Sequence, residues 1–282
     1  MSSFSINAHT DYEKKISTQD PRIHNLGSLN RVWVIGSVRG KVNLLEKIFN
    51  KIINKMLPLD RLVFTGNLVG NNLEENNYSA RTIDLTLQFR AQFLSNKCSD
   101  VMDVVFLRGY FEEILEKSIE LHMSPNPMEL VDWMYSRGLD QILKSYDISS
   151  DLLHNAARSG AAALSRASVE IRDAINNHPG HSDYLASLKR LAFNKERTLL
   201  FVSAGLSKDR PIETQGDELW WGGGFVNLDD PYFDMLRIIR GYDPNNRGLA
   251  SGKHGITLDG GDEGICAALF QSDGKLLETI QA

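Results

Sequence analysis

This sequence of 282 residues has little cysteine, no excess of positive charge and no long apolar run. Its two cysteines, Cys98 and Cys266, lie far apart and have no histidine or cysteine at metal-binding spacing, which excludes a disulfide framework and a structural zinc site. The net charge of -5 argues against nucleic-acid binding, which needs a basic excess to neutralise phosphates. The N-terminus lacks the apolar run of a signal peptide, and no uncharged apolar stretch of about 18 residues is present. We therefore expect a cytoplasmic protein that binds neither a membrane nor nucleic acid.

Apolar residues are abundant enough, at 42%, to fill the core of an α/β domain. The first thirty residues are polar, mixed in charge and without periodicity, so the pattern predicts a mobile N-terminal arm over 1–30. Residues 31–282 are predicted to form one domain, because no repeat or low-complexity linker divides them.

Three units of strand, glycine turn and helix open this domain. The strand patterns span 31–36, 60–67 and 101–110, and each precedes apolar residues at helical spacing. Such alternation is typical of βαβ units in a largely parallel sheet, whose ligands bind at the carboxyl ends of the strands. We therefore expect the three turns to converge on one site.

The middle of the chain has helix patterns and no strand patterns. Residues of about 112–196 show amphipathic helix patterns, which predict a helical cap inserted in the domain. Strand patterns return at 198–206 and 235–243, and near the C-terminus an Asp273-Gly274 turn between alternating segments predicts a hairpin.

The turns themselves read, in chain order, GSVRG, GNLVGNN, LRGYFEE, FVSAGL and RGYDP. Their order and spacing resemble the calcineurin-like metallophosphoesterases of the bacterial serine/threonine-protein-phosphatase type, whose turns read G-D-x-H-G, G-D-x-V-D-R-G, R-G-N-H-E, V-H-A-G and G-H-T. The resemblance covers roughly residues 31–281 and implies an α/β sandwich of two mixed β-sheets flanked by helices, with a helical cap. In that family two divalent cations about 3.5 to 4 Å apart clamp the phosphoryl group and generate the nucleophile.

The residues that the family uses as metal ligands are replaced here. Ser37 and Arg39 stand where the first turn of the family has aspartate and histidine, and Asn67 stands where it has the bridging aspartate. In the second turn Gly70 replaces an aspartate and Asn71 replaces a phosphate-binding arginine. In the third turn Tyr110 replaces an asparagine ligand and Phe111 replaces the general-acid histidine. Ser203 and Tyr242 replace the last two histidines. The resemblance therefore predicts a pseudophosphatase with no catalytic residue, no bound metal and no cofactor.

Arg39 strengthens this prediction, because a guanidinium keeps its proton and repels a divalent cation. The structural interpretation is that Arg39 fills the place of the metal and pairs with Glu112 or Asp259. The functional alternative is that Arg39 and Arg108 keep a weak anion or phosphate site.

The remaining candidates have structural explanations. Four histidines fall in the predicted cap and are predicted to be surface or loop residues, and none replaces a missing ligand by position: His122, His154, His178 and His181. His254 is predicted to be a structural residue at the start of a strand, and Trp220 and Trp221, beside a run of glycines, to pack the rim of a core.

Three functions are compatible with these patterns. The first is a binding or regulatory module that retains the phosphatase scaffold and engages a protein partner of unknown identity. The second is a phosphoester or nucleotide hydrolase with a rearranged acidic site, drawn from Asp209, Asp217, Glu112, Asp259 and Asp262. The third is a non-hydrolytic sensor that binds a phosphate-containing ligand or nucleotide through Arg39 and Arg108.

Overall fold

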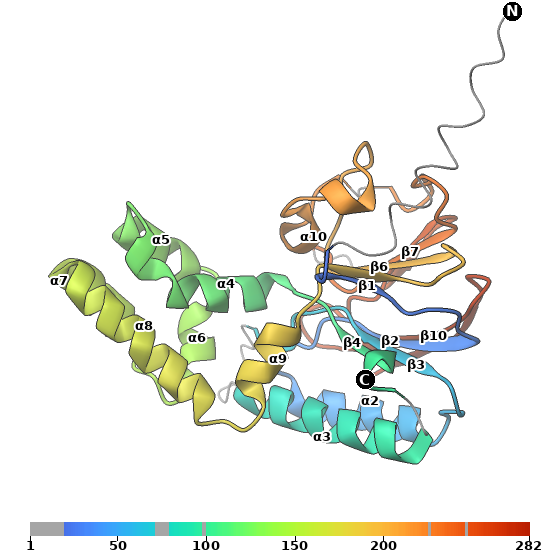
Figure 1. Ribbon diagram of the computed structural model, residues 1–282, viewed down its shortest axis with the longest axis horizontal. Coiled ribbons are helices and arrows are strands. Elements are labelled where there is room, and N and C mark those ends of the chain that lie inside the picture. Colours follow the sequence, from blue (N-terminus) through green and yellow to red (C-terminus); the bar gives the residue numbers. More distant parts are fainter. Residues whose placement is uncertain (1–19, 71–78, 98–99, 225–226, 246–247) are drawn as a thin grey trace, which may run out of the picture.

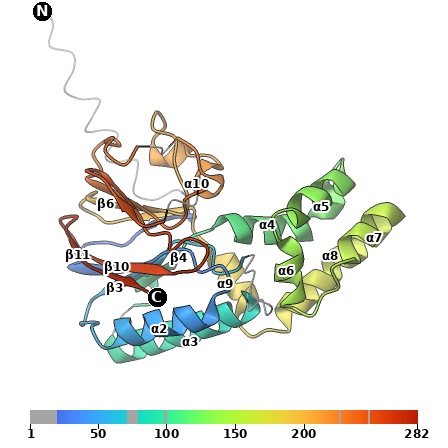
Figure 2. The ribbon, with the colours of Figure 1, turned by 180° about the vertical axis from the view of Figure 1, so that it is seen from behind.

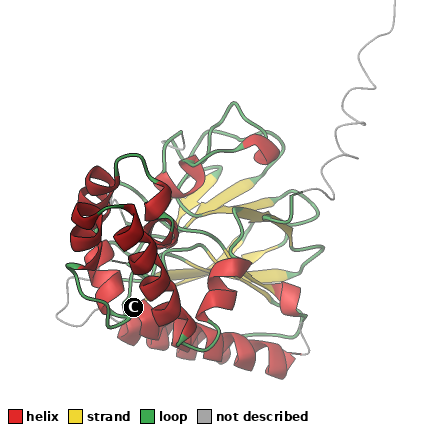
Figure 3. Cartoon of the chain, turned by 60° about the vertical axis from the view of Figure 1, so that its left-hand side comes forward, coloured by secondary structure: helices red, strands yellow, loops and turns green. Residues whose placement is uncertain are grey.

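The computed structural model of the protein describes residues 20–70, 79–97, 100–224, 227–245 and 248–282. Two β-sheets lie one above the other, helices cover the outer face of one sheet, and further helices project from one end (Figure 1). Figure 3 shows the strands in two layers, with helices below and to one side of them. The predicted fold class, an α/β sandwich of two mixed sheets flanked by helices, is confirmed.

One sheet contains the strands of the first three predicted units and the C-terminal hairpin. Its strands are β2 (Arg31–Ile35), β3 (Arg61–Phe64), β4 (Val104–Phe106), β10 (Cys266–Gln271) and β11 (Leu276–Gln281). Their spatial order is β11-β10-β2-β3-β4, in which β2, β3 and β4 run parallel and β10 runs antiparallel to β2 and β11. The central strands are covered on both faces, which explains why they read as continuous apolar runs.

The second sheet is built mainly from the C-terminal half. Its strands are β1 (Ile23–Asn25), β5 (Leu191–Phe193), β6 (Leu199–Val202), β7 (Arg237–Arg240), β8 (Ala250–Ser251) and β9 (Gly255–Thr257). They lie in the order β1-β5-β6-β7-β9-β8, with β6, β7 and β9 parallel. The strand patterns predicted at 198–206 and 235–243 are therefore confirmed.

The alternation of side chains along β2 links the two hydrophobic cores. Val32 and Val34 belong to the core between the sheets, where they share a cluster with Phe201 of β6. Trp33 and Ile35 point to the opposite face and belong to the core under the helices. This period of two is what a strand buried on both faces requires.

Two helices, α2 (Val42–Ile53) and α3 (Ser79–Lys97), cover the outer face of the β2 sheet. Phe49 of α2 stacks on Phe89 of α3 with ring centres 3.9 Å apart and meets Phe64 of β3 edge-on at 6.1 Å. These aromatic contacts fix both helices against the sheet.

The chain between β4 and β5 forms the helical cap, which extends away from the sheets (Figure 2). Its helices are α4 (Tyr110–Ile119), α5 (Pro127–Tyr135), α6 (Leu139–Lys144), α7 (Leu152–Ser159), α8 (Ala161–Asn176) and α9 (His181–Ser187). The last helix ends at Ser187 and β5 follows, so the helical part is shorter than the predicted range of about 112–196. Within the described chain, no helix is long and apolar enough to cross a membrane.

The predicted mobile arm over 1–30 does not hold for residues 20–30. Strand β1 pairs in parallel with β5, and Leu26 and Leu29 are buried in the core between the sheets. Three strand residues and two leucines are too few to produce a periodic pattern, so only the tertiary contacts reveal that this segment belongs to the domain. Residues 1–19 of the predicted arm lie outside the described residues.

We expect Leu29→Ala to lower the free energy of unfolding by about 2–4 kcal/mol, because the substitution leaves a cavity between the sheets. The matched control is Leu57→Ala, at a leucine whose side chain is exposed, which should change stability by less than about 0.5 kcal/mol. Urea denaturation measures both. Equal stability of the two variants would mean that residues 20–30 do not fold with the domain.

Candidate functional site

The turns that follow β2, β3, β6 and β7 meet at the carboxyl ends of their strands. The backbone N–H of Ser37 donates to the carbonyl of Gly241 at 3.0 Å, and the N–H of Arg39 donates to the carbonyl of Asn67 at 2.7 Å. The N–H of Gly241 donates in turn to the carbonyl of Ser203 at 3.0 Å. These bonds bring Ser37, Arg39, Asn67 and Ser203 to one edge of the molecule. The third turn that was predicted to converge, after β4, joins this edge through the N–H of Phe111, which donates to Oδ1 of Asn67.

Asn67, at the position of the family's bridging aspartate, joins three turns. Its Nδ2 donates to Oγ of Ser37 at 3.2 Å, and its Oδ1 accepts from the backbone N–H of Phe111 at 3.1 Å. The side chain is fully buried, and the backbone is left-handed with φ of 56°, a region that asparagine tolerates better than most residues. A carboxylate cannot donate a hydrogen bond, so the amide cross-links the turns in a way that aspartate would not.

Arg39 is buried and paired with acids. Its Nη2 donates to both carboxylate oxygens of Asp259 at 2.9 and 2.7 Å, and its Nη1 lies 3.3 Å from Oδ1 of Asp262. The guanidinium carbon lies 5.0 Å from the ring centre of Tyr242, at cation–π distance. The pairing predicted with Asp259 is confirmed, and the pairing proposed with Glu112 does not occur, because that carboxylate is engaged elsewhere.

Asp259 and Lys41 complete the charged cluster around Arg39. The Asp259 carboxylate also accepts the backbone N–H groups of Asp243 at 2.8 Å and Gly261 at 3.0 Å. Nζ of Lys41 donates to the carbonyls of Gly261 and Gly264 at 2.7 and 2.8 Å. Burial, helped by the charge of Arg39, lowers the pKa of Lys41 to about 8. Two basic side chains, Arg39 and Lys41, therefore lie together at this edge with Asp259.

Glu112, the acidic residue that remains from the third motif, lies beneath the site and is completely buried. It accepts the backbone N–H groups of Asn67 at 2.8 Å and Leu68 at 2.7 Å, and that of Gly109 at 3.1 Å at the start of α4. The hydroxyl of Tyr184 in α9 donates to it at 3.1 Å. Burial raises the pKa of the Glu112 carboxyl, whereas the backbone donors oppose that shift. Glu112 thus shapes the turn after β3 and also ties α9 to it.

Several aromatic rings contact one another at this edge. Tyr110 meets Trp221 at 5.0 Å and Tyr242 at 5.9 Å between ring centres, and Trp221 meets Trp133 of α5 at 5.5 Å. We call these four half-buried residues, Tyr110, Trp133, Trp221 and Tyr242, the aromatic row. Phe111 is buried against Tyr110. The side chains of Tyr110 and Tyr242 are thus packed together with Trp221 at this edge.

Gly70 lies against the backbone of Arg39. A Cβ atom on Gly70 would lie 2.8 Å from Cα of Arg39, so the aspartate of the family does not fit beside the present Arg39 backbone. Ser203 is buried, and its Oγ has no hydrogen-bond partner among the described residues. Asn71 lies outside the described residues.

Arg108 has acidic partners of its own. Its Nη1 donates to Oε2 of Glu113 at 2.7 Å and also pairs with Glu116, and its guanidinium carbon lies 6.0 Å from the ring centre of Trp220. Arg39 and Arg108 are therefore neutralised by separate sets of carboxylates. The structure shows no contact between the two arginines within the residues it describes.

The acids of the proposed rearranged site do not form one cluster either. Asp259 and Asp262 face Arg39, and Glu112 faces backbone N–H groups. Asp209 and Asp217 are exposed in the segment between β6 and α10 (Glu218–Trp221). Among the described residues, a different group of potential metal ligands does converge. It consists of Asp84, His178 and His181, whose ligand atoms lie within 4.8 Å of one another.

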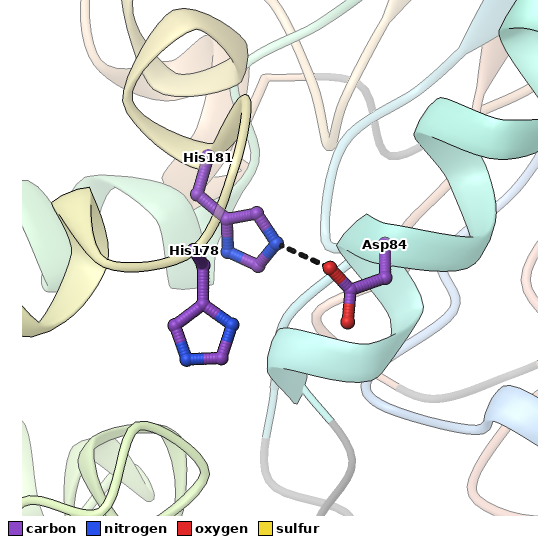
Figure 4. A group of neighbouring side chains, drawn as sticks. All are labelled: Asp84, His178 and His181. Atoms are coloured by element: carbon purple, nitrogen blue, oxygen red, sulfur yellow. Dashed lines mark hydrogen bonds and ion pairs between the residues drawn. The ribbon is translucent and has the colours of Figure 1, made fainter.

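His181 was predicted to be a surface or loop residue, and that prediction is wrong. Its ring is fully buried, and its Nε2 lies 3.1 Å from Oδ1 of Asp84 (Figure 4). Its Nδ1 lies 2.9 Å from the hydroxyl of Tyr146. Burial lowers the pKa of His181. His178 is half-buried, and the two-residue gap between the histidines was the sequence signal that the prediction overlooked.

The other histidines follow the prediction more closely. His122 is exposed, and His154 is half-buried and contacts Asp132 at 2.8 Å. His254 directly precedes β9, and its Nδ1 lies 3.3 Å from the carbonyl oxygen of Leu236. Trp220 is buried among apolar residues of the second sheet, as predicted for the rim of a core.

Known structures share this architecture. A candidate diadenosine tetraphosphatase superposes with a TM-score of 0.51 at 16% identity, over 92% of this chain and 97% of that chain. A protein serine/threonine phosphatase from Saccharomyces cerevisiae with similarity to human phosphatase PP5 gives a TM-score of 0.53 at 14% identity, over 97% of this chain and 87% of that chain. The fold is metallophosphatase-like. No family model matches the sequence, no curated protein matches it significantly, and identities this low establish the fold alone.

We expect Glu112→Gln to destabilise the protein by about 2–3 kcal/mol, because the new amide would point N–H groups at backbone N–H donors in a site without water access. Glu120→Gln, at an exposed position near the end of α4, should change stability by less than about 0.5 kcal/mol. Chemical denaturation compares the two variants. Full stability of Glu112→Gln would instead indicate that the native carboxyl is protonated, since glutamine resembles a neutral acid.

Proposed function

We propose that this protein is a catalytically inactive, metallophosphatase-like protein that acts as a binding or regulatory module for a protein partner. The observation that carries the proposal is the buried Arg39–Asp259 ion pair at a turn where the resembling family binds metal. Dinuclear catalysis needs two cations about 3.5 to 4 Å apart, held by anionic or neutral donors. Here a fixed cation and a buried lysine occupy that region instead.

Electrostatics support the loss of the metal pair. Two unit charges of the same sign repel by about 4 kcal/mol at ~4 Å and an effective dielectric constant of ~20, and a divalent ion doubles this repulsion. Arg39 cannot relieve it by losing a proton. Asp259, the acid nearest to Arg39, already accepts two hydrogen bonds from the guanidinium and two from backbone N–H groups.

The aromatic row supports the second half of the proposal. Tryptophan, tyrosine and arginine are enriched in protein interfaces and dominate their binding energy. Trp133, Trp221 and Tyr242 are half-buried rather than covered, and Arg137 lies over the Trp133 ring at 4.4 Å. The surface joins the cap to the sheets, so a partner bound there would contact both parts.

The hydrolase alternative makes the opposite prediction for activity. We expect no hydrolysis of a generic phosphoester above background in added manganese, whether the chain is wild type or carries Asp259→Asn. The measurement should include His178→Ala, so that a metal ion held outside these turns is not mistaken for a catalytic one. Turnover by the wild type that disappears in Asp259→Asn would overturn the proposal.

The aromatic row is tested by affinity capture with quantitative mass spectrometry. Trp221→Ala should weaken binding of a partner that the wild type captures by at least about tenfold, as expected for an interface hot spot. Phe233→Ala, which removes an equally apolar but 60% exposed ring elsewhere, is the matched control. Circular dichroism would show that both variants are folded, and equal capture by both would exclude the aromatic row as the binding surface.

A further inference from the structure

We propose that Asp84, His178 and His181 form a binding site for one divalent transition-metal ion, with Zn²⁺ as the best match. The site is separate from the turns discussed above. Asp84 comes from α3, His178 from the loop between α8 and α9, and His181 from the start of α9. Figure 4 shows the His181 ring directed at Asp84 and the His178 ring beside it.

The spacing fits metal coordination. The ligand atoms of all three residues lie within 4.8 Å of one another, and Nε2 of His181 is 3.1 Å from Oδ1 of Asp84. Metal–nitrogen and metal–oxygen bonds of about 2.0–2.2 Å place neighbouring ligands about 3–3.5 Å apart. The His181–Asp84 pair already has this separation, and a rotation of the half-buried His178 side chain would close the third edge.

The second shell around His181 is the kind that metal-binding histidines have. The hydroxyl of Tyr146, a buried residue, lies 2.9 Å from Nδ1 of His181 and holds the ring so that Nε2 faces Asp84. Such a partner on the far nitrogen fixes the ring orientation of a ligand. The rings of His178 and His181 lie 4.9 Å apart at 31° to each other, which keeps both imidazoles on the same side.

Ligand chemistry and access select the ion. Two imidazoles and one carboxylate suit zinc and its transition-metal neighbours, whereas magnesium and calcium prefer oxygen ligands. His181 is buried, but His178 and Asp84 are half-buried, so the open side leaves room for water at a fourth position. Besides His181 at 3.1 Å, Asp84 pairs with Arg81 at 3.9 Å, and the Arg81 side chain is largely exposed and can swing into solvent.

The bound ion would join the end of the cap to the main body of the molecule. Without the ion, His181 and Asp84 join α9 to α3 by a hydrogen bond alone. A metal site and a purely structural hydrogen bond differ in their dependence on His178. Among the described contacts His178 has no hydrogen bond to Asp84 or His181, but a metal ion would need it as the third ligand.

The test uses the full chain after removal of metal with a chelator. Isothermal titration calorimetry with Zn²⁺ should show one site, and Co²⁺ should give the visible absorption of a low-symmetry nitrogen–oxygen site. His178→Ala and Asp84→Asn should each weaken Zn²⁺ binding by more than about tenfold. Zinc should also raise the melting temperature of the wild type and not that of His178→Ala.

The matched control is His154→Ala, which removes the histidine of another His–Asp contact of the cap, 2.8 Å from Asp132. Its zinc affinity should equal that of the wild type. Absence of stoichiometric binding, or equal affinity of His178→Ala and the wild type, would overturn the proposal and leave a structural hydrogen bond between His181 and Asp84.

Discussion

The ion pair between Arg39 and Asp259 is the interaction that holds together the turns at the carboxyl ends of the strands. It joins the turn after β2 to the segment after β9, and through the N–H of Asp243 it also reaches the turn after β7. Both partners are buried, so removing either one would leave a charge without compensation, at a cost of about 3–5 kcal/mol. The pair is therefore part of the packing of this edge.

Neighbouring residues contact Arg39 and one another through groups that the family's aspartates do not have. The Gly70 backbone approaches Arg39 so closely that a side chain there would clash, and Asn67 donates to Ser37 with an amide that aspartate lacks. Restoring one of the family's ligands would thus disturb contacts made by the others. In this structure Ser37, Arg39, Asn67 and Gly70 form a set with its own internal contacts.

Local patterns were sufficient to predict much of this architecture. The apolar runs of β2 and β3, the hairpin at Asp273-Gly274 and the convergence of the glycine turns all follow from periodicity and chain order. The sequence could not decide whether Arg39 pairs with Glu112 or with Asp259. Asp259 is 220 positions away, and its proximity to Arg39 depends on the assembled sheets. The burial of His181 arises likewise from Tyr146 and Asp84, 35 and 97 positions away, which no local pattern reports.

The contact between Trp133 and Trp221 has an optical consequence. Trp133 belongs to α5 of the cap and Trp221 to α10 of the sheet region, and their rings meet edge-on at 5.5 Å. Indole emission responds to neighbouring rings and to solvent, so any shift of the cap relative to the sheets would alter the fluorescence of both residues. The native tryptophans can therefore report the position of the cap relative to the sheets without an added label.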